Sequence, residues 1–463
     1  MGQKHQQSTD STSDSKKKRR VAIAPIDTGV EANECIQIFM VGSKDEAEAG
    51  TGYQIDPLDL NHFFDDDGKI YGYQSLKITI WVSSVSFHVY TDITFESSSD
   101  RGKGITDLKA ALQDMFAENI VEKKDDFFQT FTIEKHYISS VISKGEVLLQ
   151  NTTDGNGHSH ADTTDTQVIR FVMGDMTAGL LYSRLVPLVL LLVDGSNPID
   201  VTDSCWEMYV IVQKIADPEG DQSRLLGFAA AYRFYHYPDT LRLRLSQVLV
   251  LPPYQQKGYG RRLLEILNNA AMSESVYDLT VEEPVDSLQR IQYYIDVPRL
   301  LTCSAVQSAV DTAATHLKEA NLSKRTESSQ LLPPLTAVNE VRKSLKINKK
   351  QFLKCWEILL YIALNPVDKY MENYRIYITD QVKASVIGKD TGTKGKQVID
   401  TPNDFGEDAF VMYKPQDCED GHVDVDVLDE DQKKQQEQQL LQIVDERVKE
   451  IQLVAQKVST TQA

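Results

Sequence analysis

The clearest pattern of alternating apolar and polar positions lies near the middle of the chain. Leucine alternates with arginine or serine over residues 241–246, which is the period-two pattern of a half-buried strand. An apolar stretch over residues 225–234 predicts a preceding strand, and turn-forming residues at 237–240 separate the two. The pattern therefore predicts a β-hairpin. Its second strand ends at Pro252 and Pro253, which cannot donate backbone hydrogen bonds, so we expect the sheet to open there.

Apolar residues at three- and four-residue spacing predict amphipathic helices in three other places. One follows the hairpin, with an apolar face made by Leu263, Leu264, Leu267, Ala270 and Ala271. Another covers residues 348–364 and stops before a proline, and the last covers residues 432–458. The longest apolar run, Leu185–Val193, is about half the roughly 20 residues that cross a membrane, so we expect a buried core segment.

These patterns, with short strands and helices alternating before residue 150, predict an α+β fold of several segments. The predicted segments are a disordered basic tail (1–27), an N-terminal α+β domain (28–150), a polar linker (151–166), a core that contains the hairpin (167–284), a C-terminal helical domain (285–387) with a loop at 321–334, an acidic mobile insertion (388–431) and a C-terminal helix (432–458).

Composition narrows the classes of partner. The 463 residues carry a formal net charge of −19, and this argues against direct, non-specific DNA binding, which needs a basic face. An acidic protein is better suited to a basic partner. Five widely spaced cysteines with no CxxC pattern favour reduced thiols.

Five consecutive cations, Lys16–Arg20, interrupt the otherwise acidic chain. A solvated charge run is the simpler interpretation, but a basic cluster in a polar tail is also typical of nuclear import signals. We therefore expect the protein in the nucleus as well as in the cytoplasm.

The loop between the hairpin and the next helix has the composition of an anion site. Its residues are Gln255, Gln256, Lys257, Gly258, Tyr259, Gly260 and Arg261. Glycines let backbone N–H groups approach a ligand, and a helix N-terminus concentrates unpaired donors. A dinucleotide fingerprint would need a third glycine where Leu263 stands, and a P-loop would need Gly-Lys-Ser/Thr, so neither nucleotide motif is present.

Acidic residues follow this helix in a short strand pattern. Asp278, Thr280 and Glu282 alternate with Leu279 and Val281, so the polar set shares one side of the strand. Glu282 is a candidate general base, although on position alone a surface carboxylate is equally compatible. A second polar cluster, with His158, His160 and Asp162, has one His-x-His pair in a linker-like segment. We predict no metal site there.

Together, the Gln-x-x-Gly-x-Gly loop after a hairpin and a double proline resembles the acetyl-CoA loop of the GNAT superfamily of N-acetyltransferases. The segments Ser246–Leu251, Pro253–Gly260 and Asp278–Pro284 resemble the type B histone acetyltransferase catalytic subunits in particular. Further matching segments occur in the same order outside that core: residues 70–73 with 76–77, 175–177, 199–201 and 346–349. The resemblance implies a GNAT-type mixed sheet flanked by helices, and it runs from about residue 30 to 380.

The resemblance also implies roles for individual residues. Acetyl-CoA would be held by backbone groups of Val248, Leu249 and Val250, by Gln255–Arg261 and by Ser287. Glu282 would be the general base, with Asp194, Asp278 and Glu283 as possible auxiliary acids. Glu283 stands where the family usually has Asp, and Asp194 stands where it has Glu. Histone tails would contact Asp65, Asp66 and Asp67 and the segment Tyr232, Arg233 and Phe234.

The resemblance implies histone H4, with H3, as substrate and a WD40-repeat histone chaperone as partner. The isolated His-x-His pair and the short apolar run lead us to expect no metal and no membrane association. Two alternatives stay open on the sequence alone. One is an acetyltransferase of the same superfamily that acts on a small amine or a protein N-terminus. The other is an inactive acetyl-CoA-binding histone chaperone scaffold.

Overall fold

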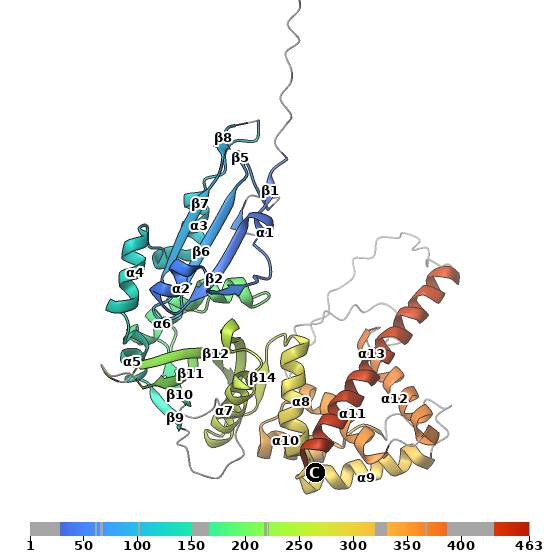
Figure 1. Cartoon of the computed structure of the whole chain (residues 1–463). Coiled ribbons are helices and arrows are strands. Elements are labelled where there is room, and N and C mark those ends of the chain that lie inside the picture. Colours follow the sequence, from blue (N-terminus) through green and yellow to red (C-terminus); the bar gives the residue numbers. More distant parts are fainter. Residues whose placement is uncertain are drawn as a thin grey trace, which may run out of the picture. The chain divides into compact units, whose positions relative to one another are not determined.

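The computed structural model describes residues 28–60, 63–64, 68–100, 102–150, 166–216, 220, 222–319, 331–365, 368–386 and 430–462. They form two compact units, whose elements are drawn in Figure 1. The first unit contains residues up to 141 together with 180–198 and 216–224. The second contains residues 142–179, 199–215 and those from 225 onwards.

The first unit is built on a four-stranded sheet with the order β3-β2-β6-β7, in which β2 and β6 are parallel and the other pairs antiparallel. Alternate residues of β2 and β6 are buried because one side of each strand faces the core. The elements are β1 (Val30–Glu31), α1 (Ala32–Cys35), β2 (Ile36–Val41), α2 (Lys44–Ala49), β3 (Tyr53–Ile55), β4 (Lys69–Ile70), β5 (Tyr73–Gln74), β6 (Lys77–Ser83), β7 (Val89–Thr94), β8 (Ser97–Ser98), α3 (Leu108–Phe116), α4 (Lys124–Ile133) and α5 (Tyr137–Ile142).

The second unit contains a six-stranded sheet with the order β14-β13-β12-β11-β10-β9. The pair β13–β14 is parallel, and β9–β10, β10–β11 and β12–β13 are antiparallel. Its elements are β9 (Glu146–Gln150), β10 (Thr166–Val172), β11 (Trp206–Ile215), β12 (Gln222–His236), β13 (Thr240–Val250), α7 (Tyr259–Ser273) and β14 (Leu279–Val281). The predicted hairpin is confirmed as β12–β13. One side of the sheet is buried against the predicted apolar face of α7, around Leu263 and Leu267.

The boundary predicted at residue 150 is wrong. Residues 142–150 belong to the second unit, because β9 pairs with β10 and its side chains Leu148 and Leu149 pack on the core beneath α7. The polar composition that begins at residue 151 marked an interruption inside the sheet, not its start. The helix α6 (Met176–Leu192) contributes to both units, and the apolar run predicted to be a core segment is buried at Leu185, Leu188, Val189 and Leu191.

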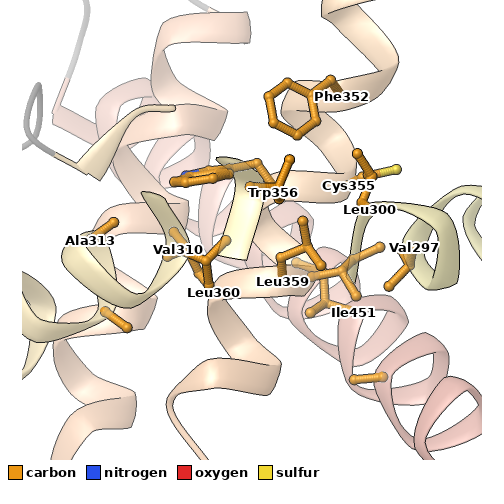
Figure 2. Close-up of a cluster of buried hydrophobic side chains, with 14 of the residues drawn as sticks. Val297, Leu300, Val310, Ala313, Phe352, Cys355, Trp356, Leu359, Leu360 and Ile451 are labelled. Carbon is orange, nitrogen blue, oxygen red and sulfur yellow. The ribbon is translucent and has the colours of Figure 1, made fainter. Parts of the chain in front are cut away.

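Helices form the rest of the second unit. They are α8 (Asp286–Leu301), α9 (Ser304–Glu319), α10 (Leu335–Leu345), α11 (Lys349–Ala363), α12 (Asp368–Val386) and α13 (Glu430–Gln462). Figure 2 shows their core, in which Trp356 and Leu359 of α11 lie among side chains of α8, α9 and α13. The helix predicted over residues 348–364 is confirmed as α11, and burial of its apolar residues accounts for the spacing that predicted it.

Some predictions fall on residues outside this description: the basic tail, the linker up to residue 165, most of the loop at 321–334 and most of the acidic insertion. Within the described ranges, each helix is too short or too polar to cross a membrane.

Candidate active site

A bulge interrupts the β12–β13 hairpin at Ser246. Ala231 lies opposite Leu245 and Ala230 lies opposite Gln247, so Ser246 is an extra residue on β13. A bulge of this kind changes which residues direct their backbone groups to each side of the strand. Before the bulge, the backbone groups of Leu245, an odd-numbered residue, are directed towards β14. Beyond the bulge, the backbone groups of the even-numbered residues are directed to that side.

The strand β13 loses its second neighbour at this bulge. Parallel pairing with β14 covers only Leu243–Leu245 opposite Leu279–Val281. The next contact is a hydrogen bond of 2.9 Å from the Glu282 N–H to the Leu245 carbonyl. Among the strands that the structure describes, none pairs with this edge of β13 beyond Leu245. The sheet therefore opens between β13 and β14 directly after Leu245, earlier along β13 than the double proline at which the opening was predicted.

The register decides which backbone groups face the opening. The Leu251 N–H donates to the Leu226 carbonyl at 2.9 Å. Because hydrogen-bonded and non-hydrogen-bonded pairs alternate along an antiparallel ladder, Leu249 also bonds towards β12, whereas Val248 and Val250 face the open edge. Of the three residues predicted to hold a ligand through backbone groups, Val248 and Val250 are oriented for it. The Leu249 amide is directed to β12.

Close packing of glycine residues shapes the end of β13. A Cβ atom on Gly227 would lie 2.6 Å from the Leu249 carbonyl oxygen, so any side chain there would push β12 and β13 apart. A Cβ atom on Gly260 would lie 3.7 Å from Val250 and 3.9 Å from Ile291 of α8. The first turn of α7 thus lies beside both β13 and α8. Gly227 is not among the predicted site residues, and its only signal in the sequence is a glycine inside a strand pattern.

The predicted anion loop leads directly into α7. Gly258 is the N-cap residue, with a left-handed φ of 87°, and it has no side chain to accept a hydrogen bond from the first turn. Gln255 donates from its side-chain amide to the Val250 carbonyl at 3.1 Å, which ties the loop to the open strand. Arg261 pairs with Glu265 on the helix surface. A helix N-terminus without a capping side chain favours an anionic ligand.

The acidic residues at the end of β14 have different environments. Glu282 is exposed, and so is Glu283, which has a left-handed φ of 34° and turns the chain towards α8. Asp278 is buried, and its two carboxylate oxygens accept hydrogen bonds from Arg242 at 2.6 and 3.1 Å. Asp278 therefore stabilises the start of β14, whereas Glu282 and Glu283 are both accessible at its end.

A half-buried cation lies on the same side of the sheet as Glu282. Arg244 is paired in register with Thr280 of β14 and with Tyr232 of β12, and its guanidinium stacks 4.3 Å from the centre of the Phe234 ring. Burial lowers the pKa of Arg244, and the charge of Glu282 opposes this effect. The two groups therefore interact electrostatically across the end of β14.

Two of the three residues in the predicted β12 contact segment are aromatic side chains on this same surface. The Tyr232 ring packs edge-on against Phe234, and against Trp206, at 4.6 and 4.9 Å between centres. A hydrogen bond with Asp203 raises the pKa of Tyr232 to about 12, so its hydroxyl stays protonated. These rings offer a half-buried apolar surface next to Arg244.

Arg233, the third residue of that segment, has a different environment. Its side chain is 16% exposed and donates to the buried Glu207 at 2.7 Å and to Glu274. Arg170 bonds to the same two carboxylates, and the Tyr209 hydroxyl donates to Glu207 at 2.7 Å. We refer to these five side chains as the Glu207 cluster. The guanidinium of Arg233 is thus already engaged within the protein, and the contact of this segment with a histone stays a prediction.

The remaining predicted residues are dispersed. Ser287 is exposed in the first turn of α8, and Asp194 is exposed in the first unit. Asp65–Asp67 and the residues His158, His160 and Asp162 lie outside the described residues. Within the described chain, no group of three or more His, Cys, Asp or Glu side chains is arranged to hold a metal ion.

Comparison with known proteins agrees with this geometry. Residues 28–194 match the family described as histone acetyl transferase HAT1 N-terminus, and residues 200–294 match the acetyltransferase (GNAT) family. A histone acetyltransferase type B catalytic subunit of Arabidopsis thaliana is 52% identical over 99% of this chain and 98% of its own length. One of the same name from Zea mays is 45% identical over 96% and 94%.

A solved aminoglycoside acetyltransferase from a soil metagenomic sample aligns at 16% identity with a TM-score of 0.22, over 30% of this chain and 88% of that one. A likeness this low carries no argument. The family is instead shown by the identity to the plant proteins over nearly the whole chain. This identity agrees with the mixed sheet, its opening and the glycine loop. The chain therefore belongs to the family of histone acetyltransferase type B catalytic subunits and is an acetyltransferase of α+β fold with a GNAT domain.

Proposed function

We propose that this protein transfers the acetyl group of acetyl-CoA to lysines in the N-terminal tails of newly synthesised free histones, chiefly histone H4, with Glu282 as general base. The observation that carries the proposal is the position of Glu282. It is an exposed carboxylate at the point where β14 leaves β13, and its backbone N–H bonds to Leu245, three residues before Val248, the first of the two residues whose backbone groups face the opening.

The residues at the opening fit acetyl-CoA, which supplies an acetyl thioester when bound. The uncapped first turn of α7, with the glycines Gly258 and Gly260, suits a pyrophosphate. The open edge at Val248 and Val250 suits the amide groups of a pantetheine chain, as an added strand would. Ser287 is exposed in the first turn of α8, four residues before Ile291, and so lies on the same face of that helix. Because Ile291 lies beside Gly260, this face borders the space in front of the glycine loop.

The chemistry requires a proton acceptor. A lysine amine has an ordinary pKa of about 10.4 and must lose a proton before it attacks a thioester at neutral pH. The Glu282 carboxylate accepts that proton directly or through water. The Val248 N–H, directed to the open edge and nearer than Val250 to the end of β14, donates to the thioester oxygen as negative charge develops there. The lysine nitrogen forms a bond to the acetyl carbon, the carbon–sulfur bond breaks, and CoA leaves as a thiolate that takes up a proton from solvent.

Substrate selection is supported by charge and by the aromatic surface. The net charge of −19 and the acidic triplet Asp65–Asp67 suit a lysine-rich tail. The rings of Tyr232 and Phe234 suit the methylene groups of a lysine side chain. A small amine would need neither feature.

The test is Glu282→Gln, which keeps the shape of the side chain and removes the proton acceptor. The catalytic constant should fall about 10²- to 10⁴-fold, as for other positioned acid–base groups, while acetyl-CoA binding stays near that of the wild type. Glu283→Gln is the matched control, because Glu283 is adjacent and also exposed, and it should lose much less. Nearly full turnover by Glu282→Gln when chemistry limits the rate would exclude Glu282 as the base.

A parallel assay tests the substrate. Wild-type protein and labelled acetyl-CoA are combined with an H4 tail peptide, free histones, nucleosomes and a polyamine. We expect free histones and the peptide to be acetylated best. Preference for the polyamine would favour the small-amine alternative instead.

We propose the partners and location on the same family basis. They are histones H4 and H3, a WD40-repeat histone chaperone, and both nucleus and cytoplasm. Co-purification of a WD40-repeat protein from the source cells tests the chaperone partner. Redistribution of a fluorescent fusion after Lys16–Arg20 are changed to Ala tests whether these cations direct nuclear import.

A further inference from the structure

A segment from the C-terminal helical region closes the outer edge of β14. The Leu279 N–H donates to the Lys346 carbonyl at 2.8 Å, and the Asn348 side-chain amide donates to the Leu279 carbonyl at 2.9 Å. Ile347 lies between them, in an isolated parallel bridge with Leu279. Both backbone groups of Leu279 on this edge are therefore bonded to residues that lie about 70 positions later in the chain.

Asn348 uses both ends of its side chain. Its amide nitrogen holds Leu279, and its carbonyl oxygen caps α11 by accepting from the Gln351 N–H at 2.9 Å. The side chain is half-buried, and these two bonds fix its orientation. Asn348 thus joins a three-residue strand to the start of a 15-residue helix that is buried in the helical core.

Packing behind β14 is incomplete. A cavity of about 20 Å³, enough for roughly one water molecule, is lined by Leu279, Val281 and Ile347 and by polar side chains of α8 and α11. Part of this side of β14 therefore has no directly packed apolar neighbour. The position of β14 therefore depends strongly on its hydrogen bonds to β13 and to residues 346–348.

We propose that Asn348 is a positioning residue that holds β14, and with it Glu282, at the opening beside β13. The inference rests on the proposed role of Glu282 as general base. Glu282 lies three residues beyond Leu279, about 10 Å along an extended chain. A shift of the strand is thus passed on to the carboxylate, and a displacement of about 1 Å can cost about a hundredfold in rate.

Two substitutions separate positioning from helix capping. Asn348→Asp keeps an acceptor for the Gln351 N–H, since Asp is as good an N-cap as Asn, but removes the donor to Leu279. Asn348→Ala loses both bonds. We expect Asn348→Asp to lower kcat about ten- to a hundredfold, with KM for acetyl-CoA within about twofold of the wild type and a nearly unchanged Tm.

Asn348→Ala should lower both kcat and Tm. Ser43→Ala is the control for losing a cap alone, because Ser43 caps α2 in the first unit by accepting from the Glu46 N–H. It should lower Tm and leave kcat unchanged.

A double variant completes the test. If Asn348 acts through Glu282, then Asn348→Asp should reduce kcat much less in a Glu282→Gln background than in the wild type. An unchanged kcat in Asn348→Asp, or an equal loss in both backgrounds, would overturn the inference. Full turnover by Glu282→Gln alone would refute the role of Glu282 as base, and this inference with it. That outcome is measured on the single variant Glu282→Gln, so it can be distinguished from a failure of the positioning role, which is measured on Asn348→Asp.

Discussion

The Glu207 cluster predicts that Arg233 contributes to stability and not to histone binding. In Arg233→Gln, Glu207 keeps its bonds from Arg170 and Tyr209 but loses a charged donor at 2.7 Å while its side chain remains 2% exposed. Breaking a buried ion pair typically costs about 3 to 5 kcal/mol. Because two donors remain, we expect the free energy of unfolding to fall by about 3 kcal/mol, at the lower end of that range.

Stability is measured by urea unfolding at pH 7, and binding by KM for an H4 tail peptide at a temperature where both proteins are folded. A loss of 3 kcal/mol corresponds to a Tm about 6 to 12 °C lower in a unit of this size. KM for the peptide should stay within about twofold. Arg375→Gln is the matched control, since Arg375 pairs with Asp445 while 49% exposed, and exposed pairs contribute less than about 1 kcal/mol.

The dependence on pH gives a second readout. Burial alone would raise the pKa of Glu207, but hydrogen bonds from Arg233 and Tyr209 outweigh it and hold that pKa below its ordinary value. A lowered pKa stabilises the fold above the unfolded-state value of about 4.3, and this stabilisation disappears as the pH falls through the folded-state value. Arg233→Gln should lose part of this acid dependence. Unchanged stability together with a raised KM would refute the reasoning and return Arg233 to the histone-binding surface.

Two further predictions concern the cofactor loop and a buried acid. Gly258→Asp, with its left-handed φ of 87° at the α7 N-terminus, should raise KM for acetyl-CoA about tenfold or more, whereas Gly50→Asp, with a φ of 67° in open space in the first unit, should leave KM unchanged in the same titration. Burial raises the pKa of Asp296 to about 6, so the contribution of Asp296 to stability should fall as the pH rises from about 4 to 6. Urea unfolding across this range should show Asp296→Asn gaining stability relative to the wild type as the pH rises.

Local periodicity was sufficient for the parts of the fold that it governs. The leucine alternation predicted β13, and the spacing of Phe352, Trp356 and Leu359 predicted α11, because in each case one side of the element is buried. The opening of the sheet did not follow from the double proline, because β13 loses its pairing with β14 at Leu245, well before Pro252. The positions of Glu282 and of the glycine loop followed from these elements.

Features that depend on distant partners could not be predicted in this way. Arg233 lies among apolar residues on β12 and has no local sign of an ion pair, yet its acceptors are Glu207, 26 residues away, and Glu274, 41 residues away. The bulge at Ser246 left the alternation of buried residues along β13 unbroken. It is visible only in the register with β12, which decides that Val248 and Val250, and not Leu249, face the opening.

The strand β14 is supported by residues that lie outside the segment matched by the GNAT family. The match to the acetyltransferase (GNAT) family ends at residue 294, but the outer edge of β14 is completed by residues 346–348. Three residues paired on one side supply few backbone bonds, and the cavity behind them weakens the support from packing. The position of Glu282 therefore depends on α11 as well as on β13. This gives the C-terminal helical region a physical reason to be continuous with the catalytic sheet in one compact unit.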